Sequence, residues 1–97
     1  MTDTGFEWDE AKRETNLLKH GIDFKDTPEL FAKPYLEDYD SNSPLDEDRW
    51  RAIGLIGNQV VLCVYTDRHG NRRIISVRPA NTEEIVLYYE RFWFDAY

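Results

Sequence analysis

The spacing of apolar and polar residues predicts two helices in the first third of the chain. Asp9 is a typical N-cap residue and Gly21 fits the left-handed position that follows a helix, so we expect the first helix over residues 9–20. A second, short helix is expected from Lys25 to Phe31, because Pro34 prevents the chain from continuing it. Both helices precede the segments that have strand character.

The centre of the chain has the pattern of consecutive strands joined by tight turns. An extended segment begins at Tyr35 and is followed by a loop from Asp38 to Asp48. Three strands are then expected, and a two-residue hairpin turn at Gly57-Asn58 joins the first two. Their ranges are 49–56, 59–66 and 72–78. The second of these is almost wholly apolar, which is typical of a central strand covered on both faces.

The last helix carries more apolar surface than packing on one sheet requires. It opens at Asn81, and its apolar stripe has helical spacing: Ile85, Tyr88, Tyr89, Phe92, Trp93 and Ala96. Further apolar residues lie outside that stripe: Val86, Leu87 and Phe94. Exposed apolar patches mark interfaces, so part of this helix is expected to face a partner. The alternative is a loosely ordered tail after about Tyr89.

Together these elements predict an α+β fold. Two N-terminal helices, an antiparallel meander of three to four strands and a C-terminal helix follow one another in the order α-α-β-β-β-β-α. The length of 97 residues allows one domain, expected to span 1–97. The apolar runs are short and the N-terminus lacks the features of a signal peptide, so we expect a cytoplasmic protein without a membrane segment. Cys63 is the single cysteine, which excludes an internal disulfide.

Charge is distributed unevenly along the chain. The formal net charge of −7 argues against non-specific binding to nucleic acid, whose phosphates would be repelled. Residues 49–78, however, carry six arginines and one aspartate, whereas each of the other parts of the chain is acidic. Arginine is the side chain best suited to planar, two-point contact with phosphate. The arginines therefore predict a local phosphate-binding surface.

Two sequence blocks resemble a known family when they are taken together. The first lies on the N-terminal helix and reads Trp8-Asp9-x-x-Lys12-x-x-x-Asn16-x-x-Lys19-His20-Gly21. The second lies on the last strand and reads Arg73-Ile74-Ile75-Ser76-Val77-Arg78-x-Ala80. From about Phe6 to Tyr89 the chain resembles the BrnT family of type II toxin–antitoxin systems. The two blocks are specific in combination, although either alone would be weak.

The resemblance implies a bacterial ribonuclease toxin with a RelE-like fold that arrests translation by cutting RNA. We expect no cofactor. The implied partner is a BrnA-like antitoxin with a ribbon-helix-helix domain, which would bind DNA on behalf of the complex. We expect a heterotetramer assembled through the dimeric antitoxin.

Five residues are candidates for catalysis: His20, Arg49, Arg73, Arg78 and Glu84. His20 has a side chain suited to proton transfer near neutral pH, or it is a helix C-terminal histidine stabilised by the helix dipole. Glu84 is either a general base for a ribose 2′-hydroxyl or the carboxylate of a capping box with Asn81. In a regular strand Arg73 and Arg78 point to opposite faces, so both serve one site only if a bulge or twist intervenes.

Further cations widen the expected RNA-contact surface: Lys12, Lys19, Arg51 and Arg72. In a regular strand Arg72 shares its face with Ile74, Ser76 and Arg78. The competing interpretation is that these charges protect edge strands from aggregation or pair with the acidic loop. The acidic residues in and immediately before that loop are Glu37, Asp38, Asp40, Asp46, Glu47 and Asp48. Its spacing matches no EF-hand, so we expect no metal site.

The favoured hypothesis is a metal-independent endoribonuclease in which the 2′-hydroxyl attacks the adjacent phosphate. Two alternatives remain at this point. One is a non-catalytic toxin-like protein that acts in transcriptional autoregulation with its antitoxin. The other is a metal-dependent hydrolase that uses the acidic loop.

Overall fold

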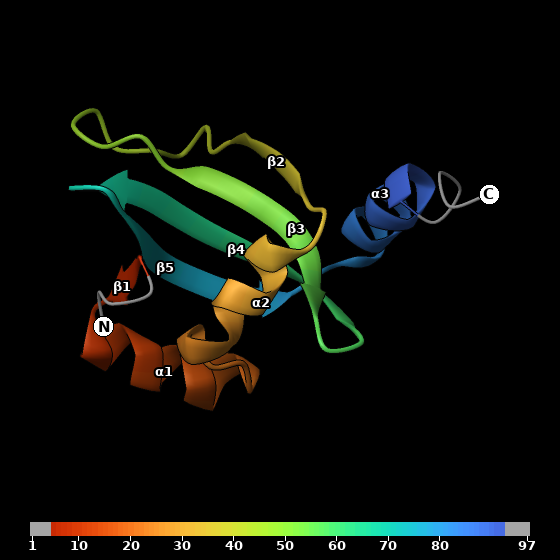
Figure 1. Ribbon diagram of the computed structural model, residues 1–97, viewed down its shortest axis with the longest axis horizontal. Helices are drawn as coiled ribbons and strands as arrows, with labels where there is room; N and C mark the ends of the chain where they lie inside the picture. Colours follow the sequence, from red (N-terminus) through yellow and green to blue (C-terminus); the bar gives the residue numbers. More distant parts are fainter. Residues whose placement is uncertain (1–4, 93–97) are drawn as a thin grey trace.

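A computed structural model describes residues 5–92, where three α-helices accompany one five-stranded sheet (Figure 1). A 3₁₀ helix, Phe24–Asp26, precedes the second α-helix. The elements in chain order are β1 (Phe6–Trp8), α1 (Glu10–His20), α2 (Thr27–Ala32), β2 (Leu36–Tyr39), β3 (Trp50–Ile56), β4 (Gln59–Arg68), β5 (Asn71–Pro79) and α3 (Thr82–Phe92). The α+β class predicted from the sequence is confirmed.

The sheet is larger and less regular than predicted. Its strand order is β1-β5-β4-β3-β2, and β1 runs parallel to β5 while the other neighbours are antiparallel. The prediction of a wholly antiparallel sheet of three to four strands is therefore wrong. The strand that was missed, β1, has three residues, too few to show a period-two pattern. A hydrogen bond from Arg72 N to Gly5 O (2.8 Å) extends this pairing by one residue.

The N-terminal helix begins and ends as the sequence predicts. The Asp9 carboxylate accepts a hydrogen bond from Lys12 N at 3.1 Å, and Gly21 adopts a left-handed conformation with φ of 71°. The segment expected as a second helix is divided, because the 3₁₀ turn comes first and α2 begins only at Thr27. Pro28 sits at the start of α2, where its missing N–H costs no hydrogen bond.

The main core lies between one face of the sheet and the first two helices. Phe24 and Leu30 are fully buried there against Val61, Cys63 and Tyr65 of β4. Figure 1 shows α1 and α2 on the same side of the sheet, with α3 standing apart. A Cβ on Gly54 of β3 would come within 3.0 Å of the Leu30 side chain, so a residue without a side chain is needed where α2 packs so closely.

Strand β5 contains a β-bulge that changes which side chains share a face. Val64 of β4 pairs with Ser76, but the next residue, Tyr65, pairs with Ile74, so Ile75 is the extra residue. Ile74 and Val77 consequently both point into the main core, where each is at most 1% exposed. The period-two assignment that placed Ile74 with Ser76 and Arg78 is therefore wrong.

Where β1 no longer pairs with β5, one side chain of α1 forms hydrogen bonds with the backbone at the outer edge of β5. Asn16 Nδ2 donates to Val77 O at 2.8 Å, and its Oδ1 accepts from Val77 N at 3.2 Å. The same amide donates to Ile22 O at 3.2 Å. Asn16 is buried, so its side chain stands in for a neighbouring strand and fixes α1 along β5.

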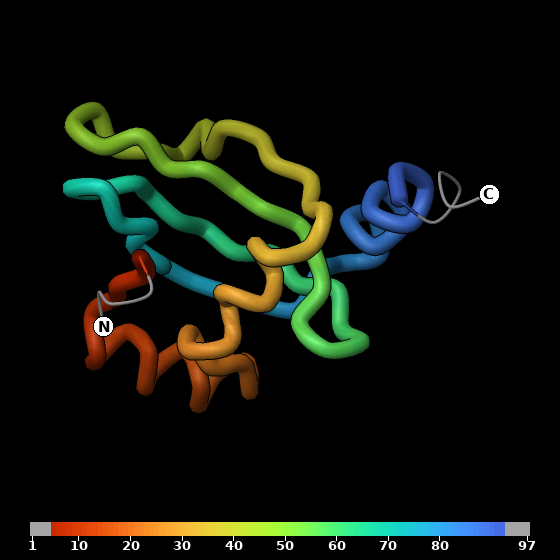
Figure 2. Tube along the Cα trace, in the orientation of Figure 1, coloured from red at the N-terminus to blue at the C-terminus, as the bar shows by residue number. Residues whose placement is uncertain are grey.

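The last helix covers one end of the sheet's second face. α3 contacts β3 and β4, and Tyr88 is its buried anchor. Ile85, Val86 and Leu87 are 37%, 50% and 53% exposed, in agreement with the excess apolar surface predicted for this helix. The predicted contributions of Trp93, Phe94 and Ala96 lie outside the described residues. The loop between β2 and β3 lies at the opposite end of the sheet from α3 (Figure 2).

Candidate functional site

Five arginines point away from α1 and α2, and we call this surface the arginine face: Arg49, Arg51, Arg68, Arg73 and Arg78. The pairing register establishes their common side. Leu62, Val64 and Thr66 alternate along β4 with the core residues and therefore point to the second face. Arg78, Arg51 and Arg73 are their respective partners on β5 and β3. Arg68 continues the alternation on β4, and Arg49 immediately precedes Arg51's strand.

The bulge at Ile75 is what brings Arg73 and Arg78 to this one surface. In a regular strand, which has no bulge, two side chains five positions apart point to opposite faces. The condition set by the sequence analysis is met, because the register shifts between the two arginines. The catalytic roles of both residues remain predictions.

Arg78 and Glu84 form a two-point ion pair at the end of the arginine face that α3 covers. Arg78 Nη1 donates to Glu84 Oε1 at 2.8 Å, and Nη2 donates to Oε2 at 2.9 Å. Glu84 also completes a capping box, since Asn81 N donates to its carboxylate at 2.8 Å and Glu84 N donates to Asn81 Oδ1 at 2.9 Å. The carboxylate is thereby held by three donors.

These contacts determine the protonation of Glu84. Partial burial by itself would raise the pKa of the carboxyl, but the hydrogen bonds from Arg78 and from the Asn81 N–H outweigh burial and leave the pKa below its usual range. The positive charge of Arg51 acts in the same direction. Glu84 is therefore an anion at neutral pH and a weak proton acceptor.

Two further arginines of the face are held by carboxylates from the edge strands. Arg51 contacts Asp38 of β2, with Nη2 and Oδ2 2.7 Å apart, and Arg73 contacts Glu7 of β1, with Nη1 and Oε2 2.7 Å apart. The hydrogen bond from Arg73 holds the pKa of Glu7 below its usual range, against the opposing effect of burial. Both guanidinium groups are therefore paired with a carboxylate and only partly exposed to solvent.

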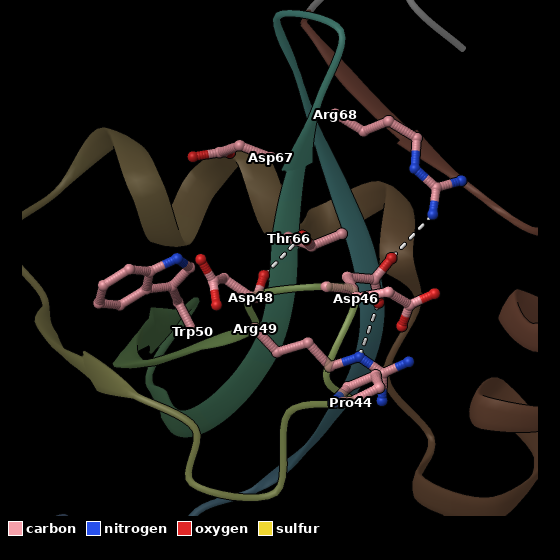
Figure 3. Close-up of a pocket in the computed structure, with 9 residues that line it drawn as sticks. Pro44, Asp46, Asp48, Arg49, Trp50, Thr66, Asp67 and Arg68 are labelled. Carbon is pink, nitrogen blue, oxygen red and sulfur yellow. Dashed lines mark hydrogen bonds and ion pairs between the residues drawn. The ribbon is translucent and has the colours of Figure 1, made fainter.

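The remaining two arginines line a polar cavity of about 660 Å³ at the end of the sheet far from α3 (Figure 3). Glu47 joins them, accepting from Arg49 Nε at 2.9 Å and from Arg68 Nη2 at 2.8 Å. Figure 3 also shows Asp46, Asp48 and Asp67 around this cavity. Four carboxylates therefore stand against two arginines, so the cavity as it stands opposes the binding of a phosphate.

Arg72 is separated from the other arginines. It precedes the bulge on the core side, and its guanidinium carbon lies 4.7 Å from the ring centre of Phe31 and 4.4 Å from that of Tyr65. It also contacts Asp67 (Nε–Oδ1, 3.2 Å). Stacking on two rings is a packing role for a cation. Arg72, which was predicted to contact RNA, therefore lies outside the arginine face.

The cations of α1 line a groove of about 350 Å³ between that helix and β5. Lys12, Lys19 and His20 are on the helix side, and Ile75 and Ser76 are on the strand side. Ser76 pairs with Val64 and thus belongs to the same side of the sheet as the arginine face. The predicted candidates of α1 and of β5 therefore adjoin each other along this edge.

Two members of the site, Glu7 and Arg68, were not predicted from the sequence. Glu7 binds Arg73, and Arg68 shares Glu47 with Arg49. The contacts of Asp38 and Glu47 agree with the alternative interpretation that arginines pair with the acidic loop. No local pattern pairs Glu7 with Arg73, because 66 positions separate them. One usable signal was present, because Ile74 and Val77 are both apolar at a spacing of three, which a regular strand does not bury on one face.

Within residues 5–92, no three side chains of His, Cys, Asp or Glu are grouped in a way that could hold a metal ion. No helix in the same range is long and apolar enough to cross a membrane.

The fold and the arginine face define a small α+β protein with five arginines gathered on one face of its sheet. The chain belongs to the BrnT family: the family model described as "Ribonuclease toxin, BrnT, of type II toxin-antitoxin system" matches residues 8–84. Membership makes it a ribonuclease toxin by family and implies an antitoxin partner and an RNA target. The comparison with curated proteins gave no match.

Proposed function

We propose that this chain is a metal-independent endoribonuclease that cuts RNA on the arginine face, acting as one RelE-like domain in the cytoplasm. The observation that carries the proposal is the convergence of Arg51, Arg73 and Arg78 on one side of the sheet, next to the lysines and histidine of the α1 groove. Preorganised cations of this kind stabilise the extra negative charge that a phosphate gains in the transition state of cleavage.

The proposed reaction needs only the substrate's own nucleophile. The ribose 2′-hydroxyl gives up its proton to a base and its oxygen bonds to the adjacent phosphorus. The bond from phosphorus to the 5′-oxygen breaks, and that oxygen takes a proton from an acid. The products are a 2′,3′-cyclic phosphate and a 5′-hydroxyl. The arginines hold the phosphate oxygens during this exchange.

Between the two proton-transfer candidates, the geometry favours His20. The Glu84 carboxylate accepts three hydrogen bonds and its pKa is lowered, since the contacts with Arg78 and Asn81 outweigh the effect of burial. A carboxylate in that state is a poor base but a good support for a guanidinium group. We assign Glu84 as a positioning residue for Arg78. His20 lines the groove and is only partly buried, so it can reach solvent and substrate.

The other predicted contacts take lesser roles in this proposal. Lys12 and Lys19 would guide the RNA backbone along α1. Arg49 lies in the acid-lined cavity, where a phosphate must first displace Glu47. Arg72 would act through the stability of the core, because it stacks on Phe31 and Tyr65.

We propose a BrnA-like ribbon-helix-helix antitoxin as the partner, in a heterotetramer that reaches DNA only through the antitoxin. The exposed apolar side chains of α3 support this, because Val86 and Leu87 lie at the end of the arginine face. A partner seated on them and on the arginines would exclude RNA. Inhibition would then need only occlusion of the surface.

A second function is favoured by a separate observation. Every arginine of the face contacts a carboxylate of the same chain, and the net charge is −7. A toxin-like protein without ribonuclease activity, retained for autoregulation with the antitoxin, would have such a neutralised surface.

One experiment separates these functions. The purified chain is incubated with total RNA, with and without EDTA, and growth is followed after induced expression without the antitoxin. The proposal expects cleavage, undiminished by EDTA, together with growth arrest. Cleavage that EDTA abolishes would indicate a metal-dependent hydrolase. No cleavage and normal growth would favour the non-catalytic function.

A further inference from the structure

The groove between α1 and β5 exists because two different elements share the outer edge of β5. Strand β1 pairs with β5 only from Arg72 to Ile74. Three residues further along, Asn16 of α1 makes two hydrogen bonds with the backbone of Val77. The bulged residue Ile75 and its neighbour Ser76 lie between these contacts and face the helix across the groove. The residues lining it are Ala11, Lys12, Thr15, Asn16, Lys19, His20, Ile75 and Ser76.

The chemistry of this lining is that of a site for a flat ring with polar edges. Ala11 and Ile75 give an apolar surface, while Thr15 and Ser76 bring hydroxyl groups that donate or accept hydrogen bonds. A volume of about 350 Å³ falls at the small end of the roughly 300–1,000 Å³ typical of ligand pockets. A single nucleobase is small enough for this volume. It also matches the lining, because its faces are apolar and its edges carry donors and acceptors.

Charge complementarity points to a nucleotide as the occupant. Lys12 and Lys19 flank the groove, and its lining residues include no carboxylate. The cavity beside Arg49 and Arg68 has four carboxylates, and a smaller one beside Leu87 has two. In a chain of net charge −7, a cavity lined by two lysines and no carboxylate suits a group that carries phosphates.

The groove also has the right position relative to the arginine face. Ser76 lines the groove and pairs with Val64, whose other neighbour is Arg51. A base in the groove would therefore leave its own phosphate at the edge of the arginine face.

We propose that the α1–β5 groove is a nucleobase subsite that selects the base next to the cleaved phosphate, with Thr15 and Ser76 reading its edge. This inference rests on the proposed ribonuclease function. It adds a determinant of sequence preference, which the arginines do not supply because they contact phosphates that every nucleotide shares.

Base preference is the quantity that tests the two hydroxyl groups. Short RNA oligonucleotides that differ in one base around a single cut site are cleaved by the wild type, Thr15→Val and Ser76→Ala. The wild type is expected to prefer one base, and each variant to lose about 5-fold or more of that preference, since one good base-edge contact contributes about 5- to 150-fold discrimination. A merely structural role would lower all rates together and leave the ratio unchanged.

A variant that fills the α1–β5 groove tests whether a base binds there. Ala11→Phe fills the groove from an exposed position of α1, and Ala32→Phe places the same side chain at an exposed position of α2. Binding is measured with non-cleavable 2′-deoxy oligonucleotides of the four single-base types. Ala11→Phe is expected to weaken binding of the preferred type at least 10-fold, and Ala32→Phe to leave it unchanged.

Each outcome decides the matter. A wild type that cuts RNA without base preference, or variants that keep the full preference, would overturn the subsite while leaving the ribonuclease function standing. A wild type that does not cut RNA overturns the proposed function, and the binding arm then decides the subsite alone. Equal binding of all four oligonucleotides, unaffected by Ala11→Phe, would show that no base enters the groove.

Discussion

Arg78 and Glu84 contact each other through two parallel hydrogen bonds of 2.8 and 2.9 Å, although one lies near the end of a strand and the other in the first turn of a helix. The pair joins β5 to α3 and fixes the direction of the guanidinium group on the arginine face. It also explains how a single glutamate serves as a helix cap and as an arginine support. The first two predictions separate these contributions.

Replacing Arg78 tests the phosphate contact. Arg78→Ala is expected to lower kcat/KM for RNA cleavage by about 10²- to 10³-fold, the usual cost of losing one preorganised donor to the transition state. Lys25→Ala removes one cation from the 3₁₀ helix, Phe24–Asp26, and serves as the matched control. A folded Arg78→Ala protein that cleaves at the wild-type rate would remove Arg78 from the site.

Replacing Glu84 by glutamine separates a positioning residue from a base. Gln retains an oxygen for the Asn81 N–H, so the melting temperature should change little, while the weaker hold on Arg78 is expected to lower cleavage about 10-fold. The shape of the pH–rate profile should stay the same. A loss of about 10³-fold or more, together with disappearance of the acidic limb of the profile, would instead identify Glu84 as the general base.

The edge contact made by Asn16 predicts a large effect on stability. Asn16→Ala leaves Val77 N–H and C=O without partners in a buried place, so the free energy of unfolding should fall by about 2–4 kcal/mol. Asn16→Asp can still accept from Val77 N but cannot donate to Val77 O, and should also destabilise. Urea denaturation measures both, with exposed Glu14→Ala as control. A change below about 0.5 kcal/mol in Asn16→Ala would contradict the strand-substitute role.

The Glu7–Arg73 pair predicts acid sensitivity. The hydrogen bond from Arg73 lowers the folded-state pKa of Glu7, so the charged carboxylate stabilises the fold above the ordinary pKa of glutamate, about 4.3. That contribution disappears as the pH falls through the lowered folded pKa. Urea midpoints measured from pH 6 down to about pH 3 should therefore decline less in Glu7→Gln than in the wild type. Equal declines in both proteins would show that Glu7 is not linked to folding; Glu14→Gln is the control.

The exposed side of α3 predicts where the antitoxin binds. Leu87→Glu, at a position 53% exposed, should weaken the complex with the protein encoded beside this gene at least 10-fold without unfolding the chain. Leu18→Glu on α1, at a position 89% exposed, is the matched control. Co-purification and the RNA assay provide the readout. A Leu87→Glu protein that is bound and neutralised as well as the wild type would place the interface elsewhere.

Much of the fold could be predicted from local signals. Asp9 and Gly21 mark the ends of α1, and the turn at Gly57 marks the β3–β4 hairpin, because caps and turns need particular residues at particular backbone angles. The parallel strand β1 could not, since three residues carry no period and the pairing partner lies more than 60 positions away. The prediction of an all-antiparallel sheet was wrong because β1 pairs with β5 in parallel.

The cations of the site could be predicted from the sequence, but which carboxylate pairs with which arginine could not. The arginines form a visible run, but their partners come from β1, β2, the loop and α3, and only the folded chain brings them together. The side of the sheet on which Arg72 lies could not be predicted from the sequence either. Its sequence context matches that of Arg73, yet one residue of offset places it against aromatic rings in the core.

The bulge at Ile75 makes the length of β5 as consequential as its composition. Deleting this one residue would leave a regular strand in which Arg73 and Arg78, then four positions apart, keep their common face, and Ile74 and Val77 keep theirs. Closing the bulge without a deletion would instead turn Arg73 inward and Ile74 outward while Val77 and Arg78 stayed in place. Among related chains, a spacing of five with a bulge, or of four without one, is therefore a sharper criterion of a shared site than the identity of the residues between the two arginines.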